Sequence, residues 1–139
     1  RKGDVTKSVC QLGECCNTLH AMNQHCYRAQ CFETTRLLVR ELDIPVGKFT
    51  TCFQSRLGND PWIRPYTEDV IKELAKKGVK SVLAFSPAFV ADCLETTIEV
   101  GEEYKELFEE QGGEHWQLVE SLNDSPLWVE TVADLVRKA

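Results

Sequence analysis

The sequence lacks an excess of positive charge, a long apolar run and an initial methionine. Its formal net charge is -6 at pH 7, which argues against a nucleic-acid partner because phosphate-binding surfaces are basic. No run approaches the roughly 20 apolar residues of a transmembrane helix, and no signal peptide is recognisable. The chain opens with Arg-Lys-Gly-Asp, and its one methionine is Met22, so we expect that it was cut from a longer protein.

Several widespread catalytic and binding motifs are also missing. The sequence has no glycine-rich phosphate loop and no G-x-S-x-G nucleophile elbow. It has no internal repeat and no low-complexity run. Its 139 residues suffice for one domain with a real hydrophobic core.

Cysteine, in contrast, is abundant. Five of the seven cysteines crowd into an irregular segment, residues 1–31: Cys10, Cys15, Cys16, Cys26 and Cys31. The even spread of a disulfide framework is absent, which favours metal or cluster ligation in a reducing compartment, here the cytoplasm. Cysteines in a loop, free or disulfide-bonded, are the alternative.

The spacing of these five cysteines bears on the kind of centre. They are separated by four, none, nine and four residues, unlike the C-x-x-C pairs of a zinc ribbon. The set offers four thiolates to a [2Fe–2S] cluster, with one to spare. Adjacent side chains in extended chain point apart, which makes one of Cys15 and Cys16 a candidate for the spare. We rank Cys10 and Cys26 highest as ligands.

Hydrophobic periodicity predicts alternating helices and strands. We expect helices over 26–42, 67–78, 87–111 and from Pro126 onward, and strands over 49–53, 81–85 and 115–121. Thr67 is expected to cap its helix, with Gly78 just beyond its end. This order predicts an α/β fold with a parallel sheet and right-handed crossovers, in which the first strand is missing from this fragment.

The helix after strand 81–85 carries a stripe of acids. On a regular α-helix one face would be apolar, formed by Val90, Leu94, Ile98, Gly101 and Phe108. Another face would be acidic, formed by Asp92, Glu95, Glu99, Glu102 and Glu106. Charge runs are usually solvated faces, and Asp92 with Glu95 also resembles a helix-capping box. The other reading is a site that needs carboxylates, because open α/β sheets bind ligands at the carboxyl ends of their strands.

Two stretches carry a resemblance to a known family. QSRLGNDPWIRPYT and SPAFVADCLETTIEVGEEY resemble the two signature segments in the carboxyl-terminal half of ferrochelatase, and the likeness extends from about Tyr27 to Val136. The resemblance implies an enzyme, a lyase of haem biosynthesis that inserts Fe²⁺ into a porphyrin. It implies two Rossmann-like lobes with the porphyrin cleft between them. Residues 27–139 would form most of the second, three-layer lobe.

The resemblance also implies site residues. Glu95 matches the active-site glutamate that faces a histidine across the porphyrin and the Fe²⁺ substrate. The other acids with implied catalytic roles are Asp92, Glu99 and Glu103, the last two leading metal or protons along the helix. The residues implied to line the porphyrin pocket are Gln54, Ser55, Arg56 and Trp62. At Cys93 relatives differ, so no role is carried over.

One part of the family pattern is absent from this sequence. The catalytic histidine sits in a His-Gly motif that would precede Arg1, and none of His20, His25 and His115 takes that place. The amino-terminal lobe is missing too, so the fragment should be inactive alone. In one bacterial group a [2Fe–2S] cluster is held by an insertion just after the His-Gly motif, and Cys10–Cys31 looks like that insertion. Peripheral membrane association and a homodimer would be compatible with the family.

Elementary chemistry agrees with these roles. Metal insertion strips water from Fe²⁺ and removes two pyrrole protons, and carboxylates bind Fe²⁺ loosely and accept protons. Trp62 offers a flat apolar wall, and Arg56 or Arg64 could pair with a propionate. A different class of function is an Fe–S or metal-binding module without catalysis. A third is a related chelatase for another metal or tetrapyrrole. The residues upstream of Arg1 would discriminate among them.

Overall fold

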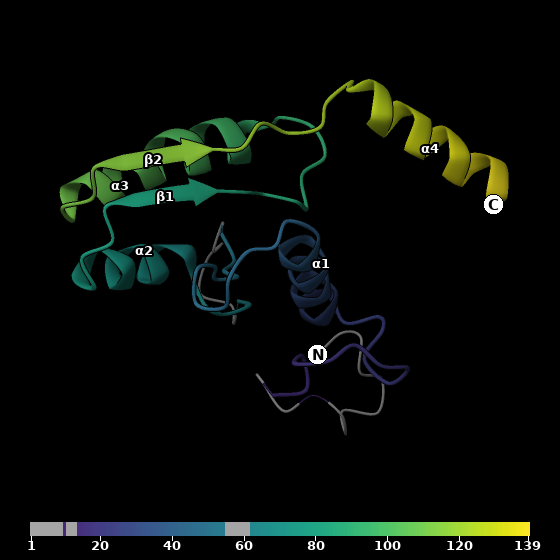
Figure 1. The fold of residues 1–139 in the computed structure, drawn as a ribbon, viewed down its shortest axis with the longest axis horizontal. Coiled ribbons are helices and arrows are strands. Elements are labelled where there is room, and N and C mark those ends of the chain that lie inside the picture. The colour runs from purple at the N-terminus through teal and green to yellow at the C-terminus, as the bar shows by residue number, and fades with distance from the viewer. Residues whose placement is uncertain (1–9, 11–13, 55–61) are drawn as a thin grey trace. The chain divides into compact units, whose positions relative to one another are not determined.

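The computed structural model describes residues 10, 14–54 and 62–139 (Figure 1). The predicted porphyrin residues Ser55 and Arg56 therefore lie outside the described residues. The chain divides into two compact units. Among the described residues, the first unit runs to Phe53 and includes residues 62–65, and the second takes Gln54 and everything from Tyr66 onward.

In the first unit the main element is helix α1, Tyr27–Glu41, which confirms the helix predicted over 26–42. The helix stops because Asp43 adopts a left-handed backbone with a φ of 51°, and Ile44 N–H then donates to the Val39 carbonyl at 2.9 Å. Aromatic contacts hold the unit together. The ring of Phe53 lies 6.5 Å from that of Tyr27 and 6.3 Å from that of Phe32.

The strand predicted over 49–53 is wrong. Its β-branched and aromatic residues favour a strand, but a strand persists only where a neighbour supplies hydrogen-bond partners. Here the Phe53 N–H donates instead to the Pro65 carbonyl at 2.9 Å. The Thr51 hydroxyl donates to the Thr35 hydroxyl at 2.9 Å. These bonds fix the segment against α1 as irregular chain.

The second unit contains a parallel sheet of strands β1, Ser81–Ala84, and β2, His115–Leu118. The two strands lie side by side, with Ser81 opposite His115 and Ala84 opposite Leu118 (Figure 1). The predicted α/β class and its parallel sheet are thus confirmed. Alternate residues point to opposite faces: Val82 packs on the core, whereas Leu83 is 66% exposed.

Three helices of this unit share a core with one face of that sheet. They are α2, Thr67–Lys76, the π-helix η1, Glu95–Glu103, and α3, Tyr104–Glu110. The buried core cluster consists of Ile71, Val100, Tyr104 and Phe108. Partly buried Val82, Ala84, Trp116 and Leu118 of the strands cover it from the sheet side. Within the described part of the unit, the sheet contributes to the core through this face.

The buried face of the η1–α3 helix differs from the predicted one. Residues that recur every fourth position are buried: Thr96, Val100, Tyr104 and Phe108. Of the predicted apolar face, Phe108 is buried but Leu94 is 75% exposed. The prediction assumed a regular α-helix from Pro87. The helix instead begins at about Glu95 and is π-helical to Glu103, and the wider i→i+5 turn changes which residues share a face.

The other helix ends follow their sequence signals in part. Helix α4, Pro126–Lys138, begins with proline in its first turn, and the Ser125 hydroxyl accepts from Trp128 N–H at 3.4 Å, as expected for a cap. Gly78 follows α2 with a φ of 77°. The predicted cap Thr67 is wrong: Thr67 is the first helical residue, and Tyr66 occupies the cap position without a side-chain bond. Among the described helices, none is long and apolar enough to cross a membrane.

Candidate functional site

The predicted acids gather at the entry and along the length of η1. The chain leaves β1 at Ala84, turns, and enters the helix at Glu95. Glu95, Glu99 and Glu103 recur at four-residue steps, each one position before the buried residues Thr96, Val100 and Tyr104. The acids therefore form a row beside the buried row, with Glu95 and Glu103 exposed and Glu99 half-buried.

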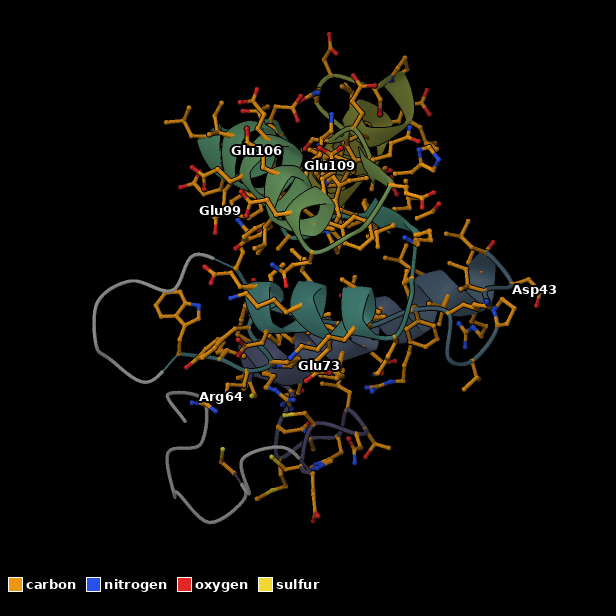
Figure 2. All side chains as sticks on the ribbon, turned by 90° about the vertical axis from the view of Figure 1, so that its left-hand side faces the viewer. Asp43, Arg64, Glu73, Glu99, Glu106 and Glu109 are labelled. Atoms are coloured by element: carbon orange, nitrogen blue, oxygen red, sulfur yellow. The ribbon has the colours of Figure 1, made fainter. Side chains whose placement is uncertain are left out.

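Glu99 is fixed to the core. The hydroxyl of the buried Tyr104 donates to Glu99 Oε1 at 2.6 Å, a short bond of the kind that an ionised acceptor makes. Glu99 projects from the same helical segment as Glu106 and Glu109 (Figure 2). The π-helix is also held from the sheet side, because the indole N–H of Trp116 donates to the Val100 carbonyl at 2.9 Å.

Asp92 lies just before the helix in a hydrogen-bonded turn. Its carboxylate accepts from the Asn123 amide at 2.8 Å, and its backbone N–H donates to Asn123 Oδ1 at 2.9 Å. Hydrogen bonds from Asn123, and then from Ser121, hold the pKa of Asp92 below its ordinary value. The carboxylate therefore stays ionised at neutral pH.

The capping-box interpretation of Asp92 and Glu95 is wrong. The residue at the cap position of the helix is Leu94, and its side chain makes no capping hydrogen bond. The first turn is closed by Thr96 instead. Its hydroxyl accepts from Cys93 N–H at 3.0 Å and donates to the Cys93 carbonyl at 3.0 Å. The Asp92 carboxylate instead accepts a hydrogen bond from the side chain of Asn123, which is 31 positions away in the sequence.

Of the predicted porphyrin residues, the structure describes Gln54 and Trp62. Gln54 belongs to the second unit and Trp62 to the first. Trp62 is 38% exposed. A cavity of about 390 Å³ lies in the first unit, and Trp62 is not among its described lining residues. Its walls are Phe32, Thr35, Arg36, Phe49, Thr50, Thr51 and Pro65.

The cysteine segment is organised by a buried asparagine. Asn23 is 4% exposed, and its amide donates to the carbonyls of Cys15 at 2.6 Å and Thr18 at 2.9 Å. Its Oδ1 accepts from His20 N–H at 2.8 Å. The described part of the segment is thus held together by hydrogen bonds from this one side chain to its backbone.

Four of the five candidate cluster ligands fall into two groups. Cys15 and Cys16 have their sulfurs 3.9 Å apart. Cys26 caps α1, and Cys31 lies one turn inside it. Burial raises the pKa of Cys16 and of Cys31, and no disulfide is present among the described cysteines. Thiols in this number suit a cluster, but in the described residues no three of His, Cys, Asp and Glu are close enough to hold a metal ion.

Three residues of these networks escaped sequence reasoning: Asn23, Tyr104 and Asn123. Asn123 belongs to a polar turn, Asn-Asp-Ser-Pro, that signals the start of α4 and nothing more. Tyr104 sits between the charged residues Glu103 and Lys105, so that only its four-residue spacing from Val100 and Phe108 could have shown it as buried. Asn23 has no sequence signal.

The comparisons with known proteins all point to one family. A family model of ferrochelatase matches residues 6–139. The chain is 49% identical over 140 residues to a ferrochelatase of Pseudomonas fluorescens, with 99% of this chain covered. It is 45% identical over 136 residues to that of Legionella pneumophila strain Lens, with 96% covered. It is 41% identical over 140 residues to that of a Coxiella burnetii strain, with 97% covered.

These relatives are considerably longer. The match covers 41% of the Pseudomonas and Legionella proteins and 40% of the Coxiella protein, so the chain spans about two-fifths of their length. The family model, however, takes in all of η1, β2 and the Asn123 turn. On this coverage and identity, the chain belongs to the ferrochelatase family.

Proposed function

We propose that this chain is the carboxyl-terminal part of a ferrochelatase, which inserts Fe²⁺ into a porphyrin to make haem. The observation that carries the proposal is the row of Glu95, Glu99 and Glu103 along a π-helix. A π-helical turn is rare and is frequently found at functional sites. Like charges at this spacing weaken a helix, so a structural role alone gives little reason to keep them.

The row suits both halves of the reaction. Carboxylates are hard oxygen ligands that bind Fe²⁺ weakly enough to release it, and they accept the two pyrrole protons. Side chains one turn apart are about 5–6 Å from one another, close enough to pass an ion or a proton along. Glu95, the first residue of η1, would contact the porphyrin. Glu99, which is hydrogen-bonded to Tyr104, and then Glu103 would be the next carboxylates to receive the ion or proton.

The remaining parts of the site come from elsewhere. Trp62 would support the macrocycle with its flat face, together with Gln54, Ser55 and Arg56. A histidine of the amino-terminal lobe would face Glu95 across the porphyrin, so the chain alone should be inactive.

The proposal is tested by replacing Glu95 with Gln in the full-length protein. The change is nearly isosteric, so the fold should persist while iron insertion is lost. Glu102→Gln is the matched control, because Glu102 is an exposed acid on the same helix but outside the row. Near-normal insertion by the Glu95 variant, or equal losses in both variants, would contradict the assignment.

We also propose a [2Fe–2S] cluster held by four of Cys10, Cys15, Cys16, Cys26 and Cys31. When bound, such a cluster can carry one electron. The thiols suit it in number and type, and a reducing cytoplasm would keep them available. Anaerobic reconstitution should give a coloured protein with about two irons and two sulfides per chain. Serine at Cys10 or Cys26 should bleach it. Stoichiometric zinc in place of iron would count against the cluster.

A further inference from the structure

Asn123 makes three hydrogen bonds to a turn that lies far away in the sequence. Its backbone N–H donates to the Val90 carbonyl at 2.9 Å. Its side-chain oxygen accepts from Asp92 N–H at 2.9 Å, and its side-chain nitrogen donates to Asp92 Oδ2 at 2.8 Å. Asn123 is therefore hydrogen-bonded to both ends of the turn at 90–92, which comes shortly before η1.

The sheet explains why these two segments meet. The parallel ladder extends one step past the strands, where Val119 N–H donates to the Ala84 carbonyl at 2.8 Å. The chain segments that follow β1 and β2 thus leave the sheet at the same edge. One carries Asp92, and the other carries Asn123.

The chemistry of the position requires asparagine. The backbone φ of Asn123 is 48°, a left-handed conformation that asparagine tolerates better than most residues. Its amide is also a donor and an acceptor at once. Aspartate would retain the acceptor for Asp92 N–H but set an anion against the Asp92 carboxylate. Glycine would retain the backbone conformation and lose both side-chain bonds.

We propose that Asn123 is a positioning residue for Asp92, holding its carboxylate in place at the entry to η1, three residues before Glu95. The inference rests on the proposed chelatase function and extends it to the loop between β2 and α4. A carboxylate that takes part in moving protons or metal must keep its place, because a displacement of about 1 Å can lower a rate by about 100-fold. Hydrogen bonds to an exposed carboxylate supply that constraint where core packing does not.

The experiment compares Asn123→Gly, Asn123→Asp and the control Asp124→Asn in the full-length protein. Asp124 is the exposed neighbour on the same turn. The first readout is the hydrogen-exchange rate of the Asp92 amide, followed by ¹⁵N-aspartate labelling. It should rise in the glycine variant and stay low in the aspartate variant, which retains the acceptor. The control should match the wild type.

The second readout is the steady-state kinetics of iron insertion. Both Asn123 variants should lower kcat by roughly 10- to 100-fold, the usual effect of removing a group that orients a functional carboxylate. The KM for porphyrin should change by less than about twofold, because Asp92 is not part of the proposed porphyrin wall. A merely structural role would leave kcat unchanged in the aspartate variant if its melting temperature equals that of the wild type.

The outcomes separate this inference from the function on which it rests. An unchanged exchange rate of the Asp92 amide in Asn123→Gly would show that the Asn123 side chain does not hold Asp92 in place. Wild-type kcat in both variants would overturn its role in the reaction. A wild-type protein without chelatase activity would refute the proposed function, while the exchange comparison would still decide whether Asn123 positions Asp92.

Discussion

Tyr104 donates its hydroxyl hydrogen to Glu99 Oε1, five residues earlier in the chain, over 2.6 Å. The step of five matches the i→i+5 period of the π-helix that contains Glu99. Tyr104 is 5% exposed and belongs to the core cluster of the second unit. The acid row is thus anchored at its middle member to the most rigid part of the unit. A regular α-helix would set these two side chains on different faces.

We predict that Tyr104→Phe impairs function more than folding. The ring still fills the core, so the free energy of unfolding should fall by only about 1 kcal/mol, for one hydrogen bond. Glu99 loses its anchor, and iron insertion by the full-length protein should fall roughly tenfold, as for other groups that orient a functional side chain. Urea unfolding and insertion kinetics measure the two effects. Tyr27→Phe, in the first unit, should leave the insertion rate unchanged, and an unaltered rate in the Tyr104 variant would refute the anchor.

Gly113→Ala should destabilise the second unit through the packing of Phe108. A Cβ at Gly113 would lie 2.3 Å from the Phe108 ring. That ring is fully buried, and its centroid lies 5.7 Å from that of the Trp116 ring, with the two ring planes tilted at 50°. Overpacking of this kind costs about 1–3 kcal/mol. Gly101→Ala is the control, because its Cβ would meet its nearest neighbours at 3.4 and 3.6 Å. Equal shifts of the urea midpoint in the two variants would show that the clash is relieved without cost.

The helices were the predictable part of the fold. Their ends follow local signals: Pro126 starts α4, Gly78 ends α2, and Asp43-Ile44-Pro45 ends α1. The burial pattern of η1 was not predictable, because a 3.6-residue period was applied to a segment that turns more widely. The strand expected over 49–53 failed for a different reason. Strand formation depends on a pairing partner, which local sequence does not specify.

The candidate acids were assigned through family resemblance rather than spacing. A stripe such as Glu95, Glu99 and Glu103 is by itself more often a solvated surface than a catalytic row. The residues that hold the acids were missed, since their partners are remote. Asn123 and Asp92 are 31 positions apart, and only the parallel sheet brings them together.

The pKa of Asp92 should rise in Asn123→Gly. The Asn123 amide is the main cause of its lowered pKa, so removal should return it toward the ordinary value of about 3.9. A folded-state pKa below the unfolded value adds stability above the unfolded pKa, and this is lost as pH falls through the folded pKa. Carboxyl ¹³C shifts measured from about pH 6 to pH 2 would follow the titration. An unchanged Asp92 titration in the Asn123→Gly variant would contradict the prediction.

Trp62→Ala should weaken porphyrin binding without much loss of stability. The indole is 38% exposed and Trp62 is not among the buried core residues, so its removal should leave the core packing in place. An aromatic contact with the macrocycle adds about 0.5–1.5 kcal/mol beyond the buried area. Loss of this contact should lower the porphyrin affinity roughly tenfold. Fluorescence titration of the full-length protein with porphyrin measures it, with Trp62→Phe as the conservative variant that should retain most of the affinity. A strongly destabilised Ala variant with unchanged porphyrin affinity would identify Trp62 as a structural residue.

Asn23→Ala should loosen the cysteine segment. The substitution strips the carbonyls of Cys15 and Thr18 of a donor and the His20 N–H of its acceptor. Each buried group left unsatisfied costs about 1–3 kcal/mol, so hydrogen exchange over residues 14–26 should accelerate. Iron uptake on anaerobic reconstitution should fall in parallel, because Cys15 and Cys16 lose their fixed place. Asn17→Ala is the matched control, since Asn17 is exposed on the same loop. Equal acceleration in both variants, or none in either, would mean that Asn23 does not organise the segment.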